Sequence, residues 1–390
     1  MTNKEEYSTK GNRIHFLDNL RTIIIFFVVL YHAGIVYESS GFGAWVWIVH
    51  DPATNDVAGI LCFLVIDIFV MSTIFFISGY LTPMSLKYEN GWAFLKARFR
   101  RLVIPWIIAV LTLMPLYKVI FLYSRGLPQE RWTTYFHFSN GNITSQNWLW
   151  FLPVLFLFNL LYVLLSSVNW VPPKISLKSA IVAIFFIGFV NSFGMDMLGI
   201  RGWTKTPLID FQNERLLLYF MIFLLGSLCF RLKVFASKPT SKTLYMIVNS
   251  TCWIPITLYI FLGLLPFISP DGILISPVVD KLVLWLSFYL SLLSLLYLLI
   301  QTSWRYLDKP GRIWNELNRN SYYVYIIHVI VLGGIALLLL NSVMPSLLKY
   351  LTLTVSTFLA SNLIISLCRR AVTSIRAINQ RDVPSLGSTP

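Results

Sequence analysis

Charged side chains are scarce in this sequence. Asp, Glu, Lys and Arg make up 12% of the 390 residues, about half the share that is usual in soluble globular domains. Hydrophobic residues reach 56%, and the mean hydropathy is +0.69. This composition excludes a soluble globular protein and points to a membrane protein.

Cysteine is also rare. The four cysteines (Cys62, Cys229, Cys252 and Cys368) lie in apolar segments without any CxxC spacing. Buried apolar cysteines are usually inert packing residues, so we expect neither disulfides nor a metal site. The sequence also lacks a Walker loop, an HExxH motif and a GxSxG motif. It therefore gives no support to a P-loop nucleotidase, a zinc protease or a serine hydrolase.

Apolar residues are instead grouped in segments of about twenty, the length that crosses the hydrocarbon core of a bilayer. We predict an all-α polytopic membrane protein with about ten transmembrane helices. The expected spans are residues 17–37, 57–82, 101–122, 148–167, 179–196, 215–231, 244–268, 278–302, 321–341 and 346–368.

The net charge of +14 is explained by topology. With the N-terminus inside, about three quarters of the 31 Lys and Arg residues fall in inner segments, which is the positive-inside pattern. It predicts that both termini are cytoplasmic and leaves no need for a nucleic-acid partner. We expect a cytosolic polar tail at 1–12, a membrane domain at 13–371 and a disordered cytosolic tail at 372–390.

The first predicted helix carries ionisable residues on one face. Arg21 and His32 are eleven positions apart, which places them within roughly 20° of each other and about 16 Å apart along the helix axis. Asp18 lies close to the same stripe. Ionisable side chains in a membrane helix are costly and normally face a protein interior or a water-filled cavity. The stripe therefore predicts a functional site.

Other polar groups have two interpretations each. Asp67, near the middle of the second span, is either an active-site residue or the partner in a structural hydrogen bond. Tyr325 and His328 share one face of the ninth span, and a histidine at that depth is more often an interhelical partner than a catalyst. In the first outer loop, His50 and Asp51 are either catalytic or a solvated pair, and we favour the solvated pair.

Arg98 and Arg101 lie three apart on a helix that enters the membrane from the cytoplasm. Two guanidinium groups there either bind a polyanion such as a nucleotide diphosphate or anchor the helix to lipid phosphates. Charge alone favours the anchor. Trp148 and Trp150, at the start of the fourth span, are either a sugar-stacking platform or an ordinary aromatic belt. The outer loop 197–214, together with the other long outer loops, is a candidate lining for an acceptor site, but it specifies no ligand.

Six motifs, in this order, resemble the acyltransferase 3 family of integral-membrane acyltransferases over roughly residues 13–340. Within the family, the resemblance is greatest to the branch that includes glucan biosynthesis protein C. Pro153 departs from the arginine that is frequent in that branch. The motifs are LDNLRTIIIFFVVLYH (17–32), IFFISGYL (74–81), RFRRLVIP (98–105), WLWFLPVLF (148–156), YFMIFLLG (219–226) and NSYYVYIIH (320–328).

The resemblance implies an O-acyltransferase that moves an acetyl or succinyl group from cytosolic acyl-CoA to a hydroxyl of a cell-envelope or extracellular saccharide. It implies that His32 is the catalytic histidine and Arg21 its motif partner. It also makes Arg98 and Arg101 contacts for the CoA phosphates, in place of a lipid anchor. We further expect Asp67 among the catalytic residues, Ser78 beside the donor, and acceptor contacts at Trp148, Trp150, Tyr325 and His328.

We expect the chain to lie in the plasma (inner) membrane, with acyl-CoA as donor and no permanently bound cofactor. The other expected partners are a saccharide or glycolipid acceptor, membrane lipids and a glycan synthase. His32 acts either as a general base, which we favour, or as an acylated relay.

The alternative function is a transporter or flippase of a glycan or lipid intermediate, with His32, Asp67 and His328 as a relay. The sequence shows no internal repeat of the kind common in transporters. A further alternative is a non-catalytic membrane partner of a glycan synthase.

Overall fold

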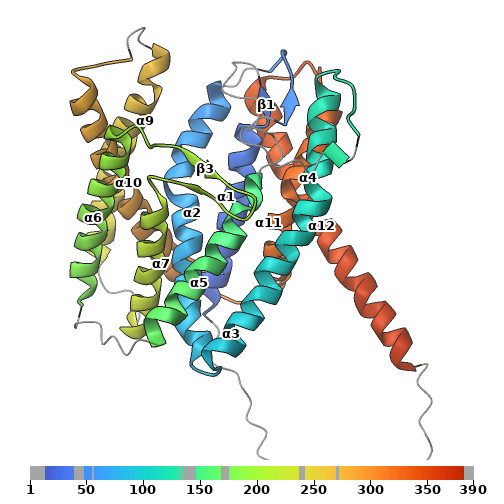
Figure 1. The fold of residues 1–390 in the computed structure, drawn as a ribbon, viewed down its shortest axis with the longest axis horizontal. Helices are drawn as coiled ribbons and strands as arrows, with labels where there is room; N and C mark the ends of the chain where they lie inside the picture. The colour runs from blue at the N-terminus through green and yellow to red at the C-terminus, as the bar shows by residue number, and fades with distance from the viewer. Residues whose placement is uncertain are drawn as a thin grey trace, which may run out of the picture.

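The structure is a computed structural model of the chain. It describes residues 14–38, 48–54, 57–131, 133–134, 146–167, 175–236, 242–268 and 272–381. The described residues form a bundle of long helices (Figure 1). Within them, nine helical stretches are long and apolar enough to cross a membrane, and a tenth, α7, is apolar but has only 16 residues. The prediction of an all-α polytopic membrane protein is confirmed.

The elements follow one another along the chain as α1 (His15–Gly34), β1 (Tyr37–Glu38), β2 (Val49–His50), α2 (Val57–Leu86), α3 (Gly91–Arg98), η1 (Phe99–Val103), α4 (Ile104–Ser124), η3 (Asn147–Trp150), α5 (Phe151–Ser167), α6 (Leu177–Met197), β3 (Trp203–Lys205), β4 (Asp210–Gln212), α7 (Leu216–Arg231), η4 (Val234–Ala236), α8 (Lys242–Thr251), α9 (Trp253–Ile268), α10 (Pro277–Tyr306), α11 (Arg312–Leu338) and α12 (Ser346–Arg381). Strands β1 and β2 pair in parallel, and β3 and β4 form an antiparallel hairpin.

Helix α1 begins and helix α12 ends on the same side of the bundle, the lower side of Figure 1. We call this side the inner end, following the predicted orientation, and the opposite side the outer end. Helix α12 continues to Arg381, into the segment 372–390 that was expected to be a disordered tail. The remainder of that segment and the predicted tail 1–12 lie outside the described residues.

Helix α1 lies at the centre of the bundle, where it packs against α2, α10, α11 and α12. Leu20, Ile24 and Val28 recur every four residues and are almost fully buried, as expected for one face of a packed helix. Beside α1, α2 and α7 approach closely through two glycines. A Cβ at Gly79 would lie 1.9 Å from a backbone oxygen of α7, and one at Gly226 would lie 2.1 Å from a backbone oxygen of α2. Small residues therefore set this spacing.

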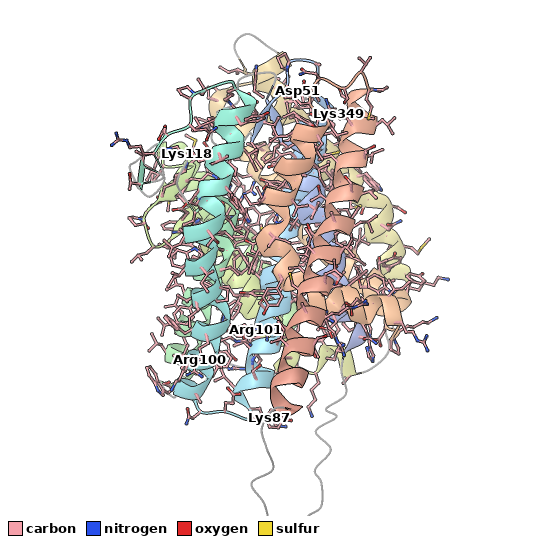
Figure 2. The ribbon with its side chains drawn as sticks, turned by 90° about the vertical axis from the view of Figure 1, so that its right-hand side faces the viewer. Asp51, Lys87, Arg100, Arg101, Lys118 and Lys349 are labelled. Atoms are coloured by element: carbon pink, nitrogen blue, oxygen red, sulfur yellow. The ribbon has the colours of Figure 1, made fainter. Side chains whose placement is uncertain are left out.

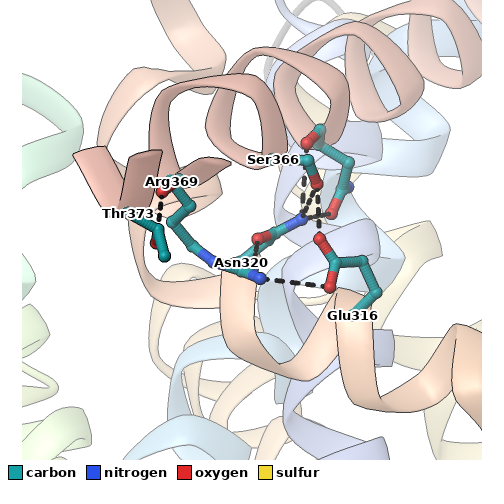
Figure 3. Close-up of polar contacts among 6 residues, drawn as sticks. Glu316, Asn320, Ser366, Arg369 and Thr373 are labelled. Atoms are coloured by element: carbon teal, nitrogen blue, oxygen red, sulfur yellow. Dashed lines mark hydrogen bonds and ion pairs between the residues drawn. The ribbon is translucent and has the colours of Figure 1, made fainter. Parts of the chain in front are cut away.

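Polar clusters fix α11 against its neighbours. On one side, the Thr22 hydroxyl donates to Asn318 at 2.5 Å, which ties α11 to α1. On the other side, Arg369 of α12 donates to Asn320 at 2.6 Å and to Glu316 at 3.1 Å (Figure 3). Each helix termination or kink inside a membrane needs such partners because water cannot supply them. The inner half of α11 is thus held from two sides.

Charged residues gather at the two ends of the bundle. Lys87, Arg100 and Arg101 lie towards the inner end, and Asp51 and Lys349 lie near the outer end (Figure 2). The interpretation of Asp51 as solvated is wrong. Its side chain is completely buried, and Nζ of Lys349 lies 2.5 Å from its carboxylate. The pair joins the outer loop to α12.

Candidate active site

His32, near the outer end of α1, contacts a second histidine. Nε2 of His328, on α11, lies 3.1 Å from Nδ1 of His32. His328 is fully buried, whereas His32 is half-buried and lines a cavity near the outer end. Two helices that are distant in the sequence therefore bring these rings together.

Backbone carbonyl groups determine which nitrogen of each ring carries the proton. Nδ1 of His328 lies 2.7 Å from the carbonyl oxygen of Tyr325, and Nδ1 of His32 lies 2.8 Å from that of Val28. A carbonyl oxygen can only accept, so each Nδ1 must donate. When both rings are neutral, Nε2 of His328 accepts from Nδ1 of His32. The nitrogen of His32 that can take up a proton is then Nε2.

The cavity beside His32, which we call the outer cavity, has a volume of about 190 Å³. Its walls come from α1, α2, η3, the β3–β4 hairpin, α7 and α11. It brings together five predicted site residues: His32, Asp67, Trp148, Trp150 and Tyr325. His328, which was expected to contact the acceptor, lines neither this cavity nor the one described below. It contacts His32 instead.

Asp67 has a fixed ionic partner that sequence reasoning did not identify. Arg215, at the start of α7, places Nη1 2.6 Å from the Asp67 carboxylate, and both side chains are largely buried. The second guanidinium nitrogen lies 3.4 Å from the hydroxyl of Tyr259. A carboxylate in a membrane protein needs such a partner. Asp67 therefore makes an interhelical ion pair and also faces the cavity that His32 lines.

The β3–β4 hairpin lies in the loop 197–214, which was a candidate lining for an acceptor site, but its strands and its individual site residues were not predicted. In the hairpin, Trp203 pairs with Gln212 and Lys205 pairs with Asp210. Alternate residues of a strand point to the same face, and these four side chains all line the outer cavity. The sequence contained a signal, because the loop 197–214 has the alternating pattern Trp-x-Lys followed by Asp-x-Gln.

Asp210 holds the hairpin over the tryptophans of η3. Its carboxylate accepts from the backbone N–H of Gln146 at 3.1 Å and from that of Thr206 at 3.0 Å. Burial raises the pKa of Asp210, although these two bonds and the nearby Lys205 oppose the shift. The ring centroids of Trp150 and Trp203 lie 5.2 Å apart in an edge-to-face arrangement. The cavity thus has one aromatic wall and one polar wall.

A second cavity, which we call the inner cavity, lies towards the inner end and has a volume of about 640 Å³. Guanidinium groups from α1, α3, η1 and α11 converge on it, together with the hydroxyl of Ser78. Arg100 and Arg319 were not predicted. The arginines that line it are Arg21, Arg98, Arg100, Arg101 and Arg319.

Arg21 is positioned by groups on both sides. One nitrogen of its guanidinium group lies 3.2 Å from the carboxylate of Asp18, and another lies 3.3 Å from the hydroxyl of Ser321. The same guanidinium group donates to the carbonyl of Asn318 at 3.3 Å. The Asp18–Arg21–His32 stripe of α1 is confirmed as a structural feature. Arg21 faces the inner cavity and His32 faces the outer one.

Arg100 and Arg101 lie in an unusual turn. Residues Phe99–Val103 form a π-helical turn, η1, between α3 and α4. Such turns are rare and are frequent at functional sites, because the wider turn alters side-chain directions and loosens the backbone hydrogen bonds. The hydroxyl of Tyr322 donates to the carbonyl of Arg101. Helix α11 therefore fixes the turn that carries Arg100 and Arg101.

A comparison with protein-family models matches residues 14–366 to a family described as an acyltransferase domain. No curated protein and no solved structure matches the chain. Within the described ranges, no three His, Cys, Asp or Glu side chains gather in a way that could hold a metal ion.

Proposed function

The chain belongs to the acyltransferase 3 family, and from this premise we propose that it moves an acetyl or succinyl group from cytosolic acyl-CoA to a hydroxyl of a saccharide on the far side of the membrane. The chain is a multi-pass membrane acyltransferase that transfers groups other than aminoacyl groups. The observation that carries the proposal is the arrangement of α1, which presents Arg21 to the inner cavity and His32 to the outer one.

The inner cavity suits the donor. CoA carries a diphosphate and a further phosphate, and guanidinium groups bind phosphate oxygens through paired, charge-assisted hydrogen bonds. Five arginines around one cavity of about 640 Å³ supply such donors. Arg98 and Arg101, which charge alone would assign to lipid, line this cavity with Arg21. Their convergence supports the assignment to CoA.

The outer cavity suits a hydroxylated acceptor. The Asp67 carboxylate, held in place by Arg215, can accept hydrogen bonds from sugar hydroxyls, and Gln212 can both donate and accept. Trp150 and Trp203 offer flat apolar faces. A few placed polar groups among aromatic rings are the usual construction of a small-molecule site. We propose a cell-envelope saccharide or glycolipid as the acceptor, as in the resemblance to the glucan branch.

In the reaction that we propose, His32 acts as the general base. The acceptor hydroxyl oxygen forms a bond to the thioester carbonyl carbon, and the C–S bond of acyl-CoA breaks. Nε2 of His32 takes the hydroxyl proton and passes it to the departing sulfur, so that the products are an ester and CoA thiol. Protein histidines in this role contribute roughly 10²- to 10⁴-fold to the rate.

His328 positions His32 for this step. It accepts from Nδ1–H of His32 at 3.1 Å and therefore holds the ring with Nε2 available. When Nε2 takes the proton, Nδ1–H still has two acceptors, His328 and the Val28 carbonyl. The positive ring is thus stabilised without any movement, which is the benefit of a preorganised site.

The proposal is tested with purified protein in liposomes that contain labelled acetyl-CoA or succinyl-CoA and a cell-envelope saccharide extract. We expect label to appear in a saccharide ester, and His32→Ala and His32→Gln to reduce this by roughly 10²-fold or more. His15→Ala, which changes a histidine outside both cavities, serves as the matched control. Unchanged transfer by both His32 variants would refute the assignment of the base. Saccharide flux without any CoA would instead support the transporter.

A further inference from the structure

Tyr325 lies at the boundary between the two cavities. Among the described residues, it is the one that lines both of them. We propose that Tyr325 is a gate between the donor in the inner cavity and the acceptor in the outer cavity. Because the gate separates the two, acyl transfer depends on the presence of an acceptor. The identity of the two ligands rests on the proposed function, whereas the gate itself rests on the geometry.

The wall between the cavities is thin. On α1, Ile25 lines the inner cavity and Val28 lines the outer one, and on α2 the change occurs between Ile74 and Met71. Three residues of an α-helix rise about 4.5 Å, which is the depth of a single side-chain layer. On α11 that layer is Tyr325 itself. One ring therefore closes the part of the wall that α11 forms.

The Tyr325 side chain is held by contacts with both cavities. Its hydroxyl donates to the carbonyl of Trp148, which lines the outer cavity. Its ring packs against that of Phe151, which lines the inner cavity, with the centroids 5.7 Å apart at 72°. The residue is only 4% exposed. A single neutral hydrogen bond is a weak restraint on a side chain, so opening of the gate breaks this bond and the ring contacts with Phe151 and His328.

Tyr325 and His328 belong to one turn of α11. The carbonyl of Tyr325 accepts from Nδ1 of His328, and His328 in turn contacts His32. His32 lies four residues beyond Val28 on α1, about 6 Å further towards the outer end. A thioester that is bound by the arginines must therefore cross the layer of Tyr325 before Nε2 of His32 can assist its reaction.

The closed gate protects the thioester from water. His32 as a general base would activate water as readily as it activates a sugar hydroxyl. Water reaching the thioester would hydrolyse acyl-CoA, with the hydroxyl of water forming the acid and the CoA sulfur taking the proton. The Tyr325 ring keeps water that enters the outer cavity apart from the thioester. Exclusion of water is a recognised means by which closed sites prevent such side reactions.

The gate is tested by thiol labelling, which needs no activity. Ser78 lines the inner cavity and not the outer one, so Ser78→Cys reports access to the inner cavity. The probe is a membrane-impermeant methanethiosulfonate added to one side of proteoliposomes, with the parent protein correcting for the native cysteines. With Tyr325 intact, we expect labelling from the inner side alone. With Tyr325→Ala, we expect labelling from the outer side to rise by at least about tenfold.

Two further variants serve as controls. Tyr325→Phe keeps the ring and loses the hydroxyl, so outer-side labelling should stay low. Tyr322→Ala enlarges the inner cavity without changing the lining of the outer one. Outer-side labelling of this variant should also stay low. Retained inner-side labelling shows that each variant is folded. Two results would overturn the gate. One is equal outer-side labelling of the Ser78→Cys protein with and without Tyr325→Ala. The other is a rise in outer-side labelling with Tyr322→Ala as large as that with Tyr325→Ala.

A second measurement follows the ratio of CoA released to ester formed. We expect Tyr325→Ala to raise this ratio by on the order of tenfold, because water now reaches the thioester, and Tyr325→Phe to stay near the wild type. An unchanged ratio in an active Tyr325→Ala protein would overturn the gate. Absence of CoA turnover in the wild type would instead refute the proposed function. The labelling result would still show whether Tyr325 separates the two cavities.

Discussion

Nε2 of His328 lies 3.1 Å from Nδ1 of His32, although 296 positions of the sequence separate the two residues. Each ring also donates through Nδ1 to a backbone carbonyl, so the pair forms a one-way chain of hydrogen bonds. Active-site bases are commonly oriented by a third group in this manner. The pair thus leaves one basic nitrogen, Nε2 of His32, on the surface of the outer cavity.

His328→Ala should lower kcat by roughly 10²-fold while leaving the KM for acyl-CoA almost unchanged. The reason is that His328 acts through His32 and does not line the inner cavity, where the arginines lie. His328→Gln should recover part of the rate, because its amide can accept from His32 and donate to the Tyr325 carbonyl. Steady-state kinetics at varied acyl-CoA decide this. A rise in KM without a change in kcat would contradict a positioning role.

Removal of a single arginine from the inner cavity should weaken donor binding. Charge-assisted hydrogen bonds contribute about 1.5–3 kcal/mol each, so Arg98→Gln, Arg101→Gln and Arg319→Gln should raise the KM for acyl-CoA by roughly 10- to 10²-fold. Arg201→Gln is the matched control, because this arginine pairs with Asp196 away from the cavity. Isothermal titration with CoA measures the effect. Equal affinities for all four variants would refute the donor site.

Arg215→Met should destabilise the protein strongly. It leaves the buried Asp67 carboxylate without its partner at 2.6 Å, and breaking a buried pair costs about 3–5 kcal/mol. The double variant Asp67→Leu/Arg215→Met should recover part of the stability, because neither charge is left unpaired. It should not recover transfer, because the cavity has lost the carboxylate of Asp67. Thermal unfolding in detergent measures the stability of the single and double variants. A loss of stability in the double variant equal to the sum of the two single losses would contradict this expectation.

The Asp51–Lys349 pair should make stability depend on pH at the acid end. Burial alone raises the pKa of Asp51, but hydrogen bonds from Lys349 and Thr54 and the charge of Lys349 outweigh it and lower the pKa from its ordinary 3.8. A depressed pKa stabilises the fold above the unfolded value, and this contribution disappears as the pH falls through the folded value.

We therefore expect the difference in unfolding temperature between the wild type and Asp51→Asn to be largest at neutral pH and to shrink below about pH 4. Unfolding of both proteins between pH 7 and pH 3 measures it. A difference that is the same at every pH would show that the carboxylate charge contributes nothing.

Hydropathy and the positions of a few ionisable residues predict much of this structure. The apolar segments predict the ten helices because crossing a bilayer requires a fixed length of hydrophobic chain. The eleven-residue spacing places Arg21 and His32 on one stripe because helix geometry is regular. Arg98 and Arg101 share one cavity with Arg21. The family resemblance implied that these two arginines contact CoA phosphates, whereas charge alone favoured a lipid anchor.

What could not be predicted depends on contacts between distant segments. Nothing in the sequence pairs Asp67 with Arg215 or His32 with His328, because side-chain partners across helices follow from packing. Asp51 was misread for the same reason, since its partner Lys349 is 298 positions away. The hairpin of Trp203 and Gln212 was not predicted because its strands have only three residues each. The Trp-x-Lys and Asp-x-Gln alternation is too short to distinguish a strand from a loop.

If donor and acceptor enter from opposite ends and meet at His32, acyl transfer must cross the membrane. This is measured with proteoliposomes of uniform orientation whose inner end faces the lumen, with labelled acyl-CoA confined inside and the saccharide supplied outside. We expect label in an external ester with the wild type, and we expect His32→Gln to reduce it by roughly 10²-fold or more without reducing CoA binding. External ester formed equally by the His32→Gln variant, or transfer only when both substrates are on the same side, would refute transfer across the membrane at His32.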